Sequence, residues 1–192
     1  TQPRAPTLDI LAPSRETICS DASRRAFRTA MNESLMTCAQ VLERYTDGPK
    51  EGLFADGSAR PNPGPGGWGV VAVYNDEVVT QRYGADPDTT NNRMELRALI
   101  EAYALLENDS TAVIYTDSQL CVNTITQWAA GWKARGWRKK SGTIKNLELV
   151  KTLYAAAQAH PHVTLKWIRA HQGNRWNEYA DALATAWARS EL

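Results

Sequence analysis

The chain has 192 residues, with 22 Lys and Arg against 21 Asp and Glu, 43% hydrophobic residues and 22% charged residues. This near-average composition fits one globular domain with an additional segment, or two small domains. No apolar run approaches the roughly 18 to 20 residues that a bilayer crossing requires, and the N-terminus is polar and studded with prolines. We therefore expect neither membrane insertion nor classical secretion.

Three cysteines, Cys19, Cys38 and Cys121, form no CxxC pair, and their odd number leaves one without a disulfide partner. A disulfide scaffold or a cysteine-based zinc site has little support, and we expect a protein of the reducing cytoplasm. The net charge of +1 argues against binding nucleic acid through bulk charge, although it is compatible with a local basic patch.

Residues 1–51 are predicted to form an N-terminal extension. Residues 1–14 contain three prolines and no apolar periodicity, which predicts an irregular or disordered lead. From Ser20 to Tyr45 the pattern is that of an amphipathic helix, which Asp-Gly-Pro at 47–49 would end. This helix either docks on its own domain or binds a protein partner. Its apolar stripe comprises Met31, Leu35, Cys38, Leu42 and Tyr45.

Residues 52–192 alternate short apolar runs, turn signals and helical windows, the pattern of an α/β domain. An antiparallel meander opens the domain, with a hairpin turn at Asn75-Asp76. The predicted strands are Leu53–Asp56, Trp68–Tyr74, Val78–Tyr83, Ala112–Thr116 and Val163–Arg169. The predicted helices are Asn92–Leu106, with Leu96, Leu99, Ile100, Tyr103 and Leu106 inward, Ser118–Trp128 with Ser118 as its cap, Asn146–Ala159 and Asn177–Ser190.

Four acidic residues occupy positions where a sheet and its helices converge. Asp56 ends the first strand and Asp117 directly follows the central one, and open α/β sheets build their sites at such strand ends. Glu95 is expected in the first turn of the helix that begins near Asn92, and Asp181 inside the last helix. Taken singly, each is more often a cap or a solvated carboxylate. Brought together, they would repel one another unless Mg²⁺ or Mn²⁺ neutralised them.

The interval from Ser118 to Leu147 contains no acidic residue and has a local charge of +6. Basic and aromatic side chains alternate in it, which suits a phosphate backbone flanked by sugar or base faces. The interval is a candidate nucleic-acid surface, and the alternative is a solvated helical face with its tryptophans in the core. The residues concerned are Lys133, Arg135, Arg138, Lys139, Lys140 and Lys145, with Trp128, Trp132 and Trp137.

His171 follows the last predicted strand, in a Gly-containing loop, and precedes Asp181 by ten residues. A lone histidine usually has a structural explanation. From this loop, however, an imidazole can swing over the carboxylates and titrate near neutral pH.

Six ordered stretches stand at compatible spacing: ADGSARPNPGPGGWG (55–69), TTNNRMEL (89–96), YTDSQ (115–119), ITQWAAGWKARGW (125–137), IKNLEL (144–149) and AHQGNRWNEYAD (170–181). Together they resemble type 1 ribonuclease H over about residues 52–192. The resemblance implies a ribonuclease H-like catalytic domain with a five-stranded mixed sheet, its first three strands antiparallel, helices on both faces and a basic helix-loop protrusion. It also implies an endonuclease that hydrolyses the RNA strand of RNA/DNA hybrids, giving 5′-phosphate and 3′-hydroxyl ends.

By this resemblance, four carboxylates and one histidine take catalytic roles. Asp56 would bridge two Mg²⁺ ions roughly 4 Å apart, one activating water and one stabilising the departing 3′ oxygen, and Mn²⁺ would be able to substitute. His171 would help proton transfer or product release. The matching metal ligands are Asp56, Glu95, Asp117 and Asp181.

The resemblance also implies contacts with the hybrid. Three amide side chains would face the RNA minor groove, where 2′-hydroxyls distinguish RNA from DNA. Two tryptophans would support the DNA strand, and two further residues would hold a DNA phosphate. The amide residues are Asn62, Asn91 and Gln119, and the tryptophans are Trp128 and Trp132. The two residues at the DNA phosphate are Thr90 and Asn146.

Two features depart from the family pattern. Asp88 stands two positions before Thr90, where the family often has a basic residue, and its charge would weaken a phosphate pocket. Residues 1–51 do not resemble the hybrid-binding module of some family members, and their balance of 7 basic against 7 acidic residues gives no reason to expect nucleic-acid binding.

Three alternatives remain open. One is a catalytically silent nucleic-acid-binding module, whose signature would be a missing acidic ligand, and none is missing. Another is a nuclease of the same superfold that acts on DNA, because a fold does not fix the substrate. The third concerns only the extension, which could recruit the enzyme to a partner. The leading hypothesis is a monomeric, Mg²⁺-dependent ribonuclease of the cytoplasm that binds RNA/DNA hybrids and no membrane.

Overall fold

A computed structural model of the chain describes residues 35–107, 110–189 and 192. The lead predicted at residues 1–14, Cys19 and the predicted helix as far as residue 34 lie outside the described residues. Among the helices that the structure describes, none is both long and apolar enough to span a membrane.

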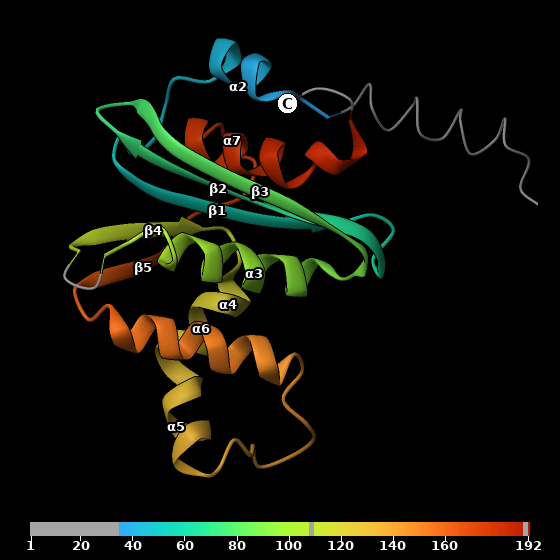
Figure 1. The fold of residues 1–192 in the computed structure, drawn as a ribbon, viewed down its shortest axis with the longest axis vertical. Helices are drawn as coiled ribbons and strands as arrows, with labels where there is room; N and C mark the ends of the chain where they lie inside the picture. Colours follow the sequence, from blue (N-terminus) through green and yellow to red (C-terminus); the bar gives the residue numbers. More distant parts are fainter. Residues whose placement is uncertain (1–34, 108–109, 190–191) are drawn as a thin grey trace, which may run out of the picture.

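A five-stranded sheet in the order β3-β2-β1-β4-β5 forms the centre of the molecule (Figure 1). β1 pairs antiparallel with β2, and β2 with β3, while β4 is parallel to both β1 and β5. This is the mixed sheet with three antiparallel leading strands that the resemblance implied, and that prediction is confirmed. The strands are β1 Gly52–Ala59, β2 Gly64–Tyr74, β3 Glu77–Thr89, β4 Ala112–Thr116 and β5 Val163–Trp167.

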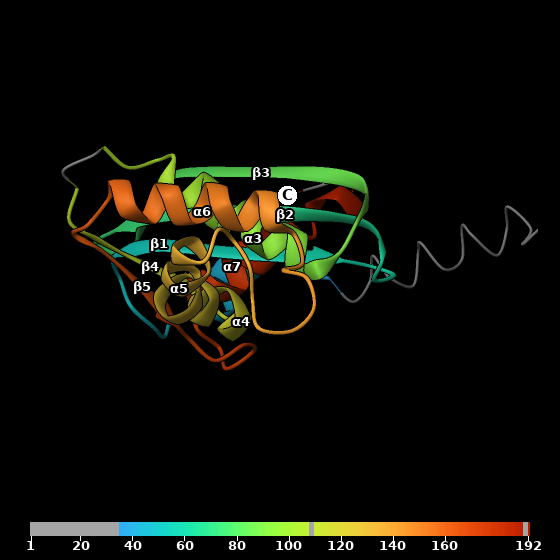
Figure 2. The same ribbon diagram turned by 90° about the horizontal axis from the view of Figure 1, so that it is seen from below.

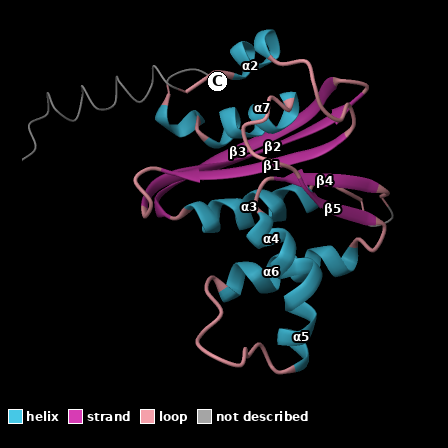
Figure 3. Ribbon diagram, turned by 180° about the vertical axis from the view of Figure 1, so that it is seen from behind, coloured by secondary structure: helices cyan, strands magenta, loops and turns pink. Residues whose placement is uncertain are grey.

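Helices cover both faces of the sheet, as expected (Figures 1 and 3). α2 (Cys38–Arg44) and α7 (Arg175–Ala184) lie on one face. α3 (Asn91–Tyr103) and α6 (Leu147–Ala159) lie on the other, with α4 (Gln119–Asn123), a π-helical turn at Thr124–Trp128, and α5 (Ala129–Ala134). A 3₁₀ turn at Ala186–Ala188 follows α7. α5 and the loop after it lie far from the sheet (Figure 1), and in Figure 2, which is seen from below, they stand in front of it.

The opening strands are longer than predicted. β1 continues through Asp56 to Ala59, because Gly57 pairs with Trp68 and the pairing with β2 runs on to the end of the strand. Asp56 therefore lies within β1 and not at its end. The hairpin turn was predicted correctly: Asn75 and Asp76 have φ of 51° and 64°, as a two-residue turn between twisted strands requires.

Several helix boundaries also differ from the predictions. The helix predicted at 118–128 has its Ser118 cap, but it passes through the π-helical turn and continues as α5 to Ala134. α7 begins earlier than predicted, because the Asn174 side chain caps it, and it ends at Ala184. α3 ends at Tyr103, so Leu106 lies outside it.

The extension is not one continuous helix up to Tyr45. Residues 35–37 are not helical, and α2 begins after Thr37, whose hydroxyl accepts from the Gln40 backbone while the Gln40 side chain accepts from the Thr37 backbone. Such a capping box satisfies two N–H groups at a helix start, which is why a new helix begins here. 

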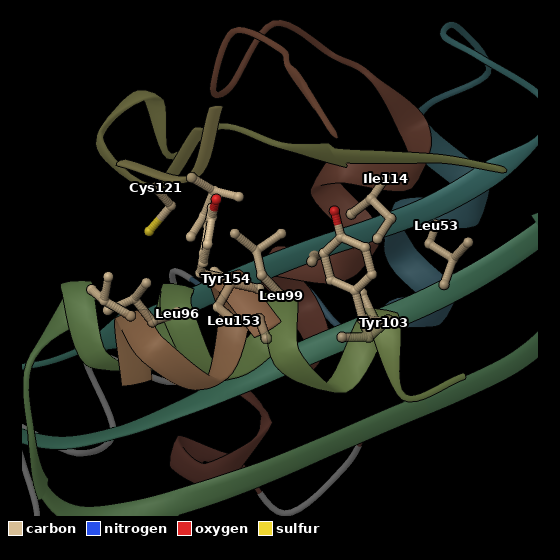
Figure 4. Close-up of a cluster of buried hydrophobic side chains, with 14 of the residues drawn as sticks. Leu53, Leu96, Leu99, Tyr103, Ile114, Cys121, Leu153 and Tyr154 are labelled. Atoms are coloured by element: carbon tan, nitrogen blue, oxygen red, sulfur yellow. The ribbon is translucent and has the colours of Figure 1, made fainter. Parts of the chain in front are cut away.

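Two hydrophobic cores lie on opposite faces of the sheet. The first, between the sheet and helices α3 and α6, is shown in Figure 4, and includes Leu53, Leu96, Leu99, Ile114 and Leu153. The second lies under α7 and includes Phe54, Val71 and Trp176 together with Cys38 and Val41 of α2. Val41 is fully buried, so α2 contributes to the core beneath it.

Gly57 is the point of closest approach between α3 and the sheet. A Cβ atom at this position would collide with the backbone of Met94 and Glu95. The absence of a side chain in β1 therefore lets α3 rest directly on the strand, one residue from Asp56. This close approach brings the backbone of Glu95 to the same end of the sheet as Asp56.

We predict that Gly57→Ala destabilises the protein by about 2 to 3 kcal/mol, because α3 must move away from β1 to admit the methyl group. The free energy of unfolding, measured by urea titration, tests this. Gly131→Ala is the matched control, since its Cβ would meet only the flexible Arg135 side chain at 3.4 Å. The control should be neutral or slightly stabilising, and equal losses in both variants would contradict the prediction.

Candidate active site

Strand register places Asp56 beside Asp117. Phe54 of β1 pairs with Tyr115 of β4, and their rings stack with centroids 4.8 Å apart. Each aspartate follows its member of this pair by two residues, so strand alternation directs both carboxylates to the same face as the stacked rings. That is the face which α7 covers. Asp117 was predicted at the end of the central strand, and it directly follows β4.

Asp181 and Glu95 approach from the two helical layers. Asp181 lies inside α7, as predicted, and is close enough to Asp56 for its charge to raise the pKa of the Asp56 carboxyl. Glu95 is the fifth residue of α3, which begins at Asn91, so its predicted place in the first turn is wrong by one residue. The structure thus gathers the four predicted carboxylates around the end of β1 and β4.

Burial and mutual repulsion shape the protonation of these acids. Desolvation raises the pKa of Asp56 well above its usual range, and the charges of Asp117, Asp181 and Glu95 raise it further, although the Gly57 backbone N–H donates to its carboxylate at 2.7 Å. Burial also raises the pKa of Glu95, partly offset by its hydrogen bond from Ser118. The pKa of Asp181 is raised by burial, against the attraction of His171.

Neighbouring polar groups orient the carboxylates. The Ser118 hydroxyl donates to Glu95 Oε2 at 2.6 Å, and the Asn177 amide donates to Asp117 Oδ2 at 3.3 Å. The Trp167 indole N–H donates to the Asp117 backbone carbonyl at 3.0 Å. These contacts come from the start of α4, from α7 and from β5, so Glu95 and Asp117 are each held by elements other than their own.

His171 lies in the exposed loop before α7, with φ of 49°. Its Nδ1 is 3.6 Å from Oε2 of Glu178, a carboxylate that is only 5% exposed. One ligand atom from each of His171, Glu178 and Asp181 lies within 4.8 Å of the others. Among the described residues, no other group of three or more potential metal ligands lies this close together.

The donor set fits a hard divalent cation. Carboxylate oxygens are the ligands that Mg²⁺ and Mn²⁺ prefer, and an acid cluster with raised pKa values is relieved by a positive ion. Of the four predicted metal ligands, Asp181 alone belongs to the group whose ligand atoms lie within 4.8 Å of one another, while Glu95 and Asp117 are near enough to Asp56 to raise the pKa of its carboxyl. Glu178 adds a carboxylate to the predicted set.

Two site residues, Asn177 and Glu178, carried no separate signal in the sequence analysis. They belong to the stretch AHQGNRWNEYAD, and Asn177 and Glu178 precede Asp181 by four and three residues. That is the helical spacing of side chains on one face. Helical periodicity applied to this stretch would have placed them beside Asp181.

A groove of about 660 Å³ lies on the side of α3, α4 and α6, and the Sγ atom of Cys121, one of its lining residues, is 3.9 Å from Oε2 of Glu95. Five of the seven predicted substrate-binding residues line it, together with two lysines of the basic interval. Asn91 and Gln119 are not among its lining residues: Asn91 accepts from the Ala59 backbone, and Gln119 donates to Asn123. The lining residues in question are Asn62, Thr90, Trp128, Trp132 and Asn146, with Lys139 and Lys145.

The tryptophans of the basic interval are divided between groove and core. Trp128 is 38% exposed and tilts toward Trp132, with ring centroids 5.9 Å apart. Trp137 packs edge-on against Tyr154 of α6. The first pair is therefore available on the groove wall, while Trp137 anchors the protrusion to the domain.

Asn146 has a fixed position at the groove edge. Its backbone is left-handed, with φ of 52°, and its side-chain amide donates to Asn92 at 2.7 Å. Arg93 donates to the Asn146 side chain at 3.3 Å and forms a 2.6 Å ion pair with Glu148. A guanidinium thus lies beside this predicted phosphate contact.

Comparison with known proteins agrees with this geometry. A family model described as RNase H matches residues 49–189. The chain belongs to the RNase H family. A Ribonuclease H of Alcanivorax borkumensis is 45% identical over 133 residues, which cover 69% of this chain and 87% of that protein. Ribonuclease HI of Caulobacter vibrioides is 44% identical over 137 residues, covering 71% and 91%.

Solved structures of RNase H proteins are also similar. LC9-RNase H1, a type 1 RNase H with the type 2 active-site motif, superimposes with a TM-score of 0.59 at 34% identity, covering 74% of each chain. LC11-RNase H1, solved in complex with an RNA/DNA hybrid, gives a TM-score of 0.51 at 25% identity and covers 69% of this chain and 92% of that one.

We predict that Asp56→Asn stabilises the metal-free protein by about 1 kcal/mol at neutral pH, because it removes a buried charge that its neighbours repel. The folded-state pKa values of Asp56, Glu95 and Asp181 are raised, so the native state binds more protons than the unfolded chain. The free energy of unfolding should therefore fall as pH rises from the ordinary carboxyl range through the raised values.

Urea denaturation in chelator across this pH range measures the effect. The variant should show a flatter pH dependence than the parent chain. Glu77→Gln, an exposed carboxylate of β3, is the control and should leave both stability and slope unchanged. A loss of stability in Asp56→Asn at neutral pH would contradict the electrostatic account.

Proposed function

We propose that this protein is a metal-dependent endonuclease that hydrolyses the RNA strand of RNA/DNA hybrids, giving 5′-phosphate and 3′-hydroxyl ends. Membership of the RNase H family supports ribonuclease activity on such hybrids. The observation that carries the proposal is the convergence of four acids, with Asp56 buried in β1 and Glu95, Asp117 and Asp181 half-buried around it, in a fold that also has a groove lined by lysine and tryptophan.

In this proposal Asp56, Glu95, Asp117 and Asp181 hold two Mg²⁺ ions, and Mn²⁺ is able to substitute. When bound, the ions supply an activated water and stabilise charge on the departing 3′ oxygen during in-line displacement. The protein keeps the ligands in place through Ser118 and Asn177, whose hydrogen bonds orient Glu95 and Asp117. Because Asp56 is already held in a buried position, its carboxylate needs little reorganisation when the reaction begins.

His171 and Glu178 would act together at the same site. The Nδ1 atom of His171 lies 3.6 Å from Oε2 of Glu178. The exposed ring can then take up or deliver a proton, or help the product to leave. We assign these two residues to the turnover step and not to metal binding alone.

The groove would hold the hybrid. Asn62, Asn91 and Gln119 are proposed to contact the RNA strand, where 2′-hydroxyls mark RNA. Trp128 and Trp132 would support the DNA strand, and Thr90 with Asn146 would hold a DNA phosphate. Lys139 and Lys145 add positive charge along the same wall. We further propose that the protein acts as a cytoplasmic monomer.

The decisive assay is cleavage of a labelled RNA/DNA hybrid beside single-stranded RNA, double-stranded RNA and duplex DNA, with Mg²⁺, with Mn²⁺ and with chelator. We expect cleavage confined to the RNA strand of the hybrid and dependent on metal. Hybrid binding without cleavage would favour the silent binding module. Cutting of duplex DNA would favour a DNA nuclease of the same fold.

Point variants refine this prediction. Asp117→Asn should abolish cleavage while hybrid binding persists, because it removes a metal ligand and leaves the basic groove intact. His171→Ala should slow turnover about tenfold to a hundredfold without eliminating it, as expected for a residue that assists proton transfer. Glu77→Gln is again the control. Near-full activity of Asp117→Asn would refute the assignment of the metal site.

Asp88 offers a separate prediction about affinity. This exposed carboxylate precedes Thr90 on the groove edge and would repel a DNA phosphate. Asp88→Asn should tighten hybrid binding about two- to fivefold at low salt, and the gain should vanish at high salt as screening increases. Fluorescence anisotropy in Ca²⁺ or chelator, without cleavage, measures this. An unchanged affinity at low salt would show that Asp88 lies outside the phosphate contact.

A further inference from the structure

Residues 37–48, here called the α2 segment, lie against the loop that carries His171. The family model begins at residue 49, so this segment lies outside the matched region. Its helix α2 is anchored by Cys38 and Val41, which are buried in the core under α7. The part after α2 runs beside residues 169–174, here called the His171 loop.

Backbone pairing joins the two. Asp47 and Asn174 form a parallel β-bridge, and the Arg175 N–H donates to the Asp47 carbonyl at 2.8 Å. Asn174 is also the N-cap of α7, the helix that carries Glu178 and Asp181. The α2 segment thus contacts the chain at the point where the His171 loop becomes the catalytic helix.

Close contacts at Gly48 and Tyr45 also join the α2 segment to the His171 loop. A Cβ at Gly48, whose φ is 119°, would lie 2.7 Å from Oδ1 of Asn174, so only glycine leaves room for that amide. The ring of Tyr45 lies under Gly173, within 3.6 Å of the place where a Cβ would stand. Gly173 itself has φ of 76°, a left-handed conformation two residues after His171.

Arg175 ties the loop end to two further elements. Its guanidinium donates to the Leu42 carbonyl at the end of α2, at 3.5 Å, and to Asp76 in the β2–β3 turn, at 3.1 Å. It also lies over the Trp176 ring, 5.1 Å from the centroid. The C-terminal end of the His171 loop is therefore fixed chiefly by α2 and the hairpin.

The rest of the His171 loop has little packing of its own. Residues 169–172 are exposed, and a hollow of about 400 Å³ lies between part of the loop, Trp167 and residues 47–48 of the α2 segment. Burial in a core therefore does not determine where the imidazole stands. The contacts that hold the loop are the one between His171 and Glu178 and those at its C-terminal end, which come from the α2 segment and, through Arg175, from the β2–β3 turn.

We propose that the α2 segment is a brace that holds the His171 loop over the carboxylates, with Tyr45 and Gly48 as positioning residues for the step that His171 serves. This inference rests on the proposed function. It gives the extension a role inside the enzyme, since a displaced loop would leave the metal ligands in place but carry His171 away from Glu178 and Asp181. The brace affects turnover and not the binding of the hybrid.

The test compares Tyr45→Ala, Tyr45→Phe and Glu43→Ala in the full chain. Glu43 is exposed on α2 and serves as the matched control. Tyr45→Ala should lower kcat about threefold to tenfold with KM unchanged, because a small misplacement of a catalytic group slows the reaction. Tyr45→Phe keeps the ring under Gly173 and should restore kcat, and Glu43→Ala should not differ from the parent chain. Full kcat in Tyr45→Ala, or a change confined to KM, would overturn the proposal.

A double-mutant cycle with His171→Ala separates positioning from a general loss of structure. If the brace acts through His171, Tyr45→Ala should have no further effect on kcat once the imidazole is gone. Multiplicative losses in the double variant would overturn the proposal, because Tyr45 would then act by another route.

Amide hydrogen exchange distinguishes failure of the brace from failure of the proposed function. Tyr45→Ala should speed exchange at residues 171–175 at least tenfold whether or not the protein cleaves hybrids, and protection elsewhere in α7 should stay the same. Unchanged exchange would overturn the brace itself. Faster exchange with full cleavage activity would mean that the contact exists but does not position His171, which also overturns the proposal.

Discussion

Repulsion among carboxylates at one end of the sheet is the constraint around which this structure is arranged. Asp56 is buried within β1 and faces the charges of three other acids, so the native state holds an unfavourable cluster. The surrounding fold keeps this cluster together: β1 and β4 are parallel and in register, α3 rests on Gly57, and α7 is capped at Asn174. A site whose charged groups are held ready for a cation commonly lowers the folding stability of the protein.

Each of the two hydrophobic cores positions a different one of these acids. The core between the sheet and α3 fixes Glu95, while the core under α7 fixes Asp181. Asp56 and Asp117 lie between them, on strands that both cores hold. Because each acid belongs to a different element, no local rearrangement can separate them without disturbing packing on one face. The acids are held by packing on both faces of the sheet. The groove beside Trp128, where the hybrid would lie, is open.

The order of strands and helices and the hairpin turn could be predicted from the sequence, because apolar periodicity and turn residues are local signals. The expectation that the acids lie near one another also held, although Asp56 lies inside β1 and not at the strand end assumed for it. Contacts without a local signal could not be predicted. The extent of β1 depends on its pairing with β2, and the part played by Asn177 and Glu178 depends on which face of α7 meets the sheet. The start of α2 after Thr37 depends on a capping box, whereas the hydrophobic stripe in the sequence runs past this point without interruption.

The burial of Val41 and Cys38 also bears on where this catalytic unit begins. The family match starts at residue 49, yet the core under α7 is closed by α2. A fragment cut at the family boundary would uncover apolar surface around Phe54, Val71 and Trp176, and uncovered patches of this kind drive self-association. For this chain, solubility of the catalytic unit therefore depends on residues that the family boundary would discard.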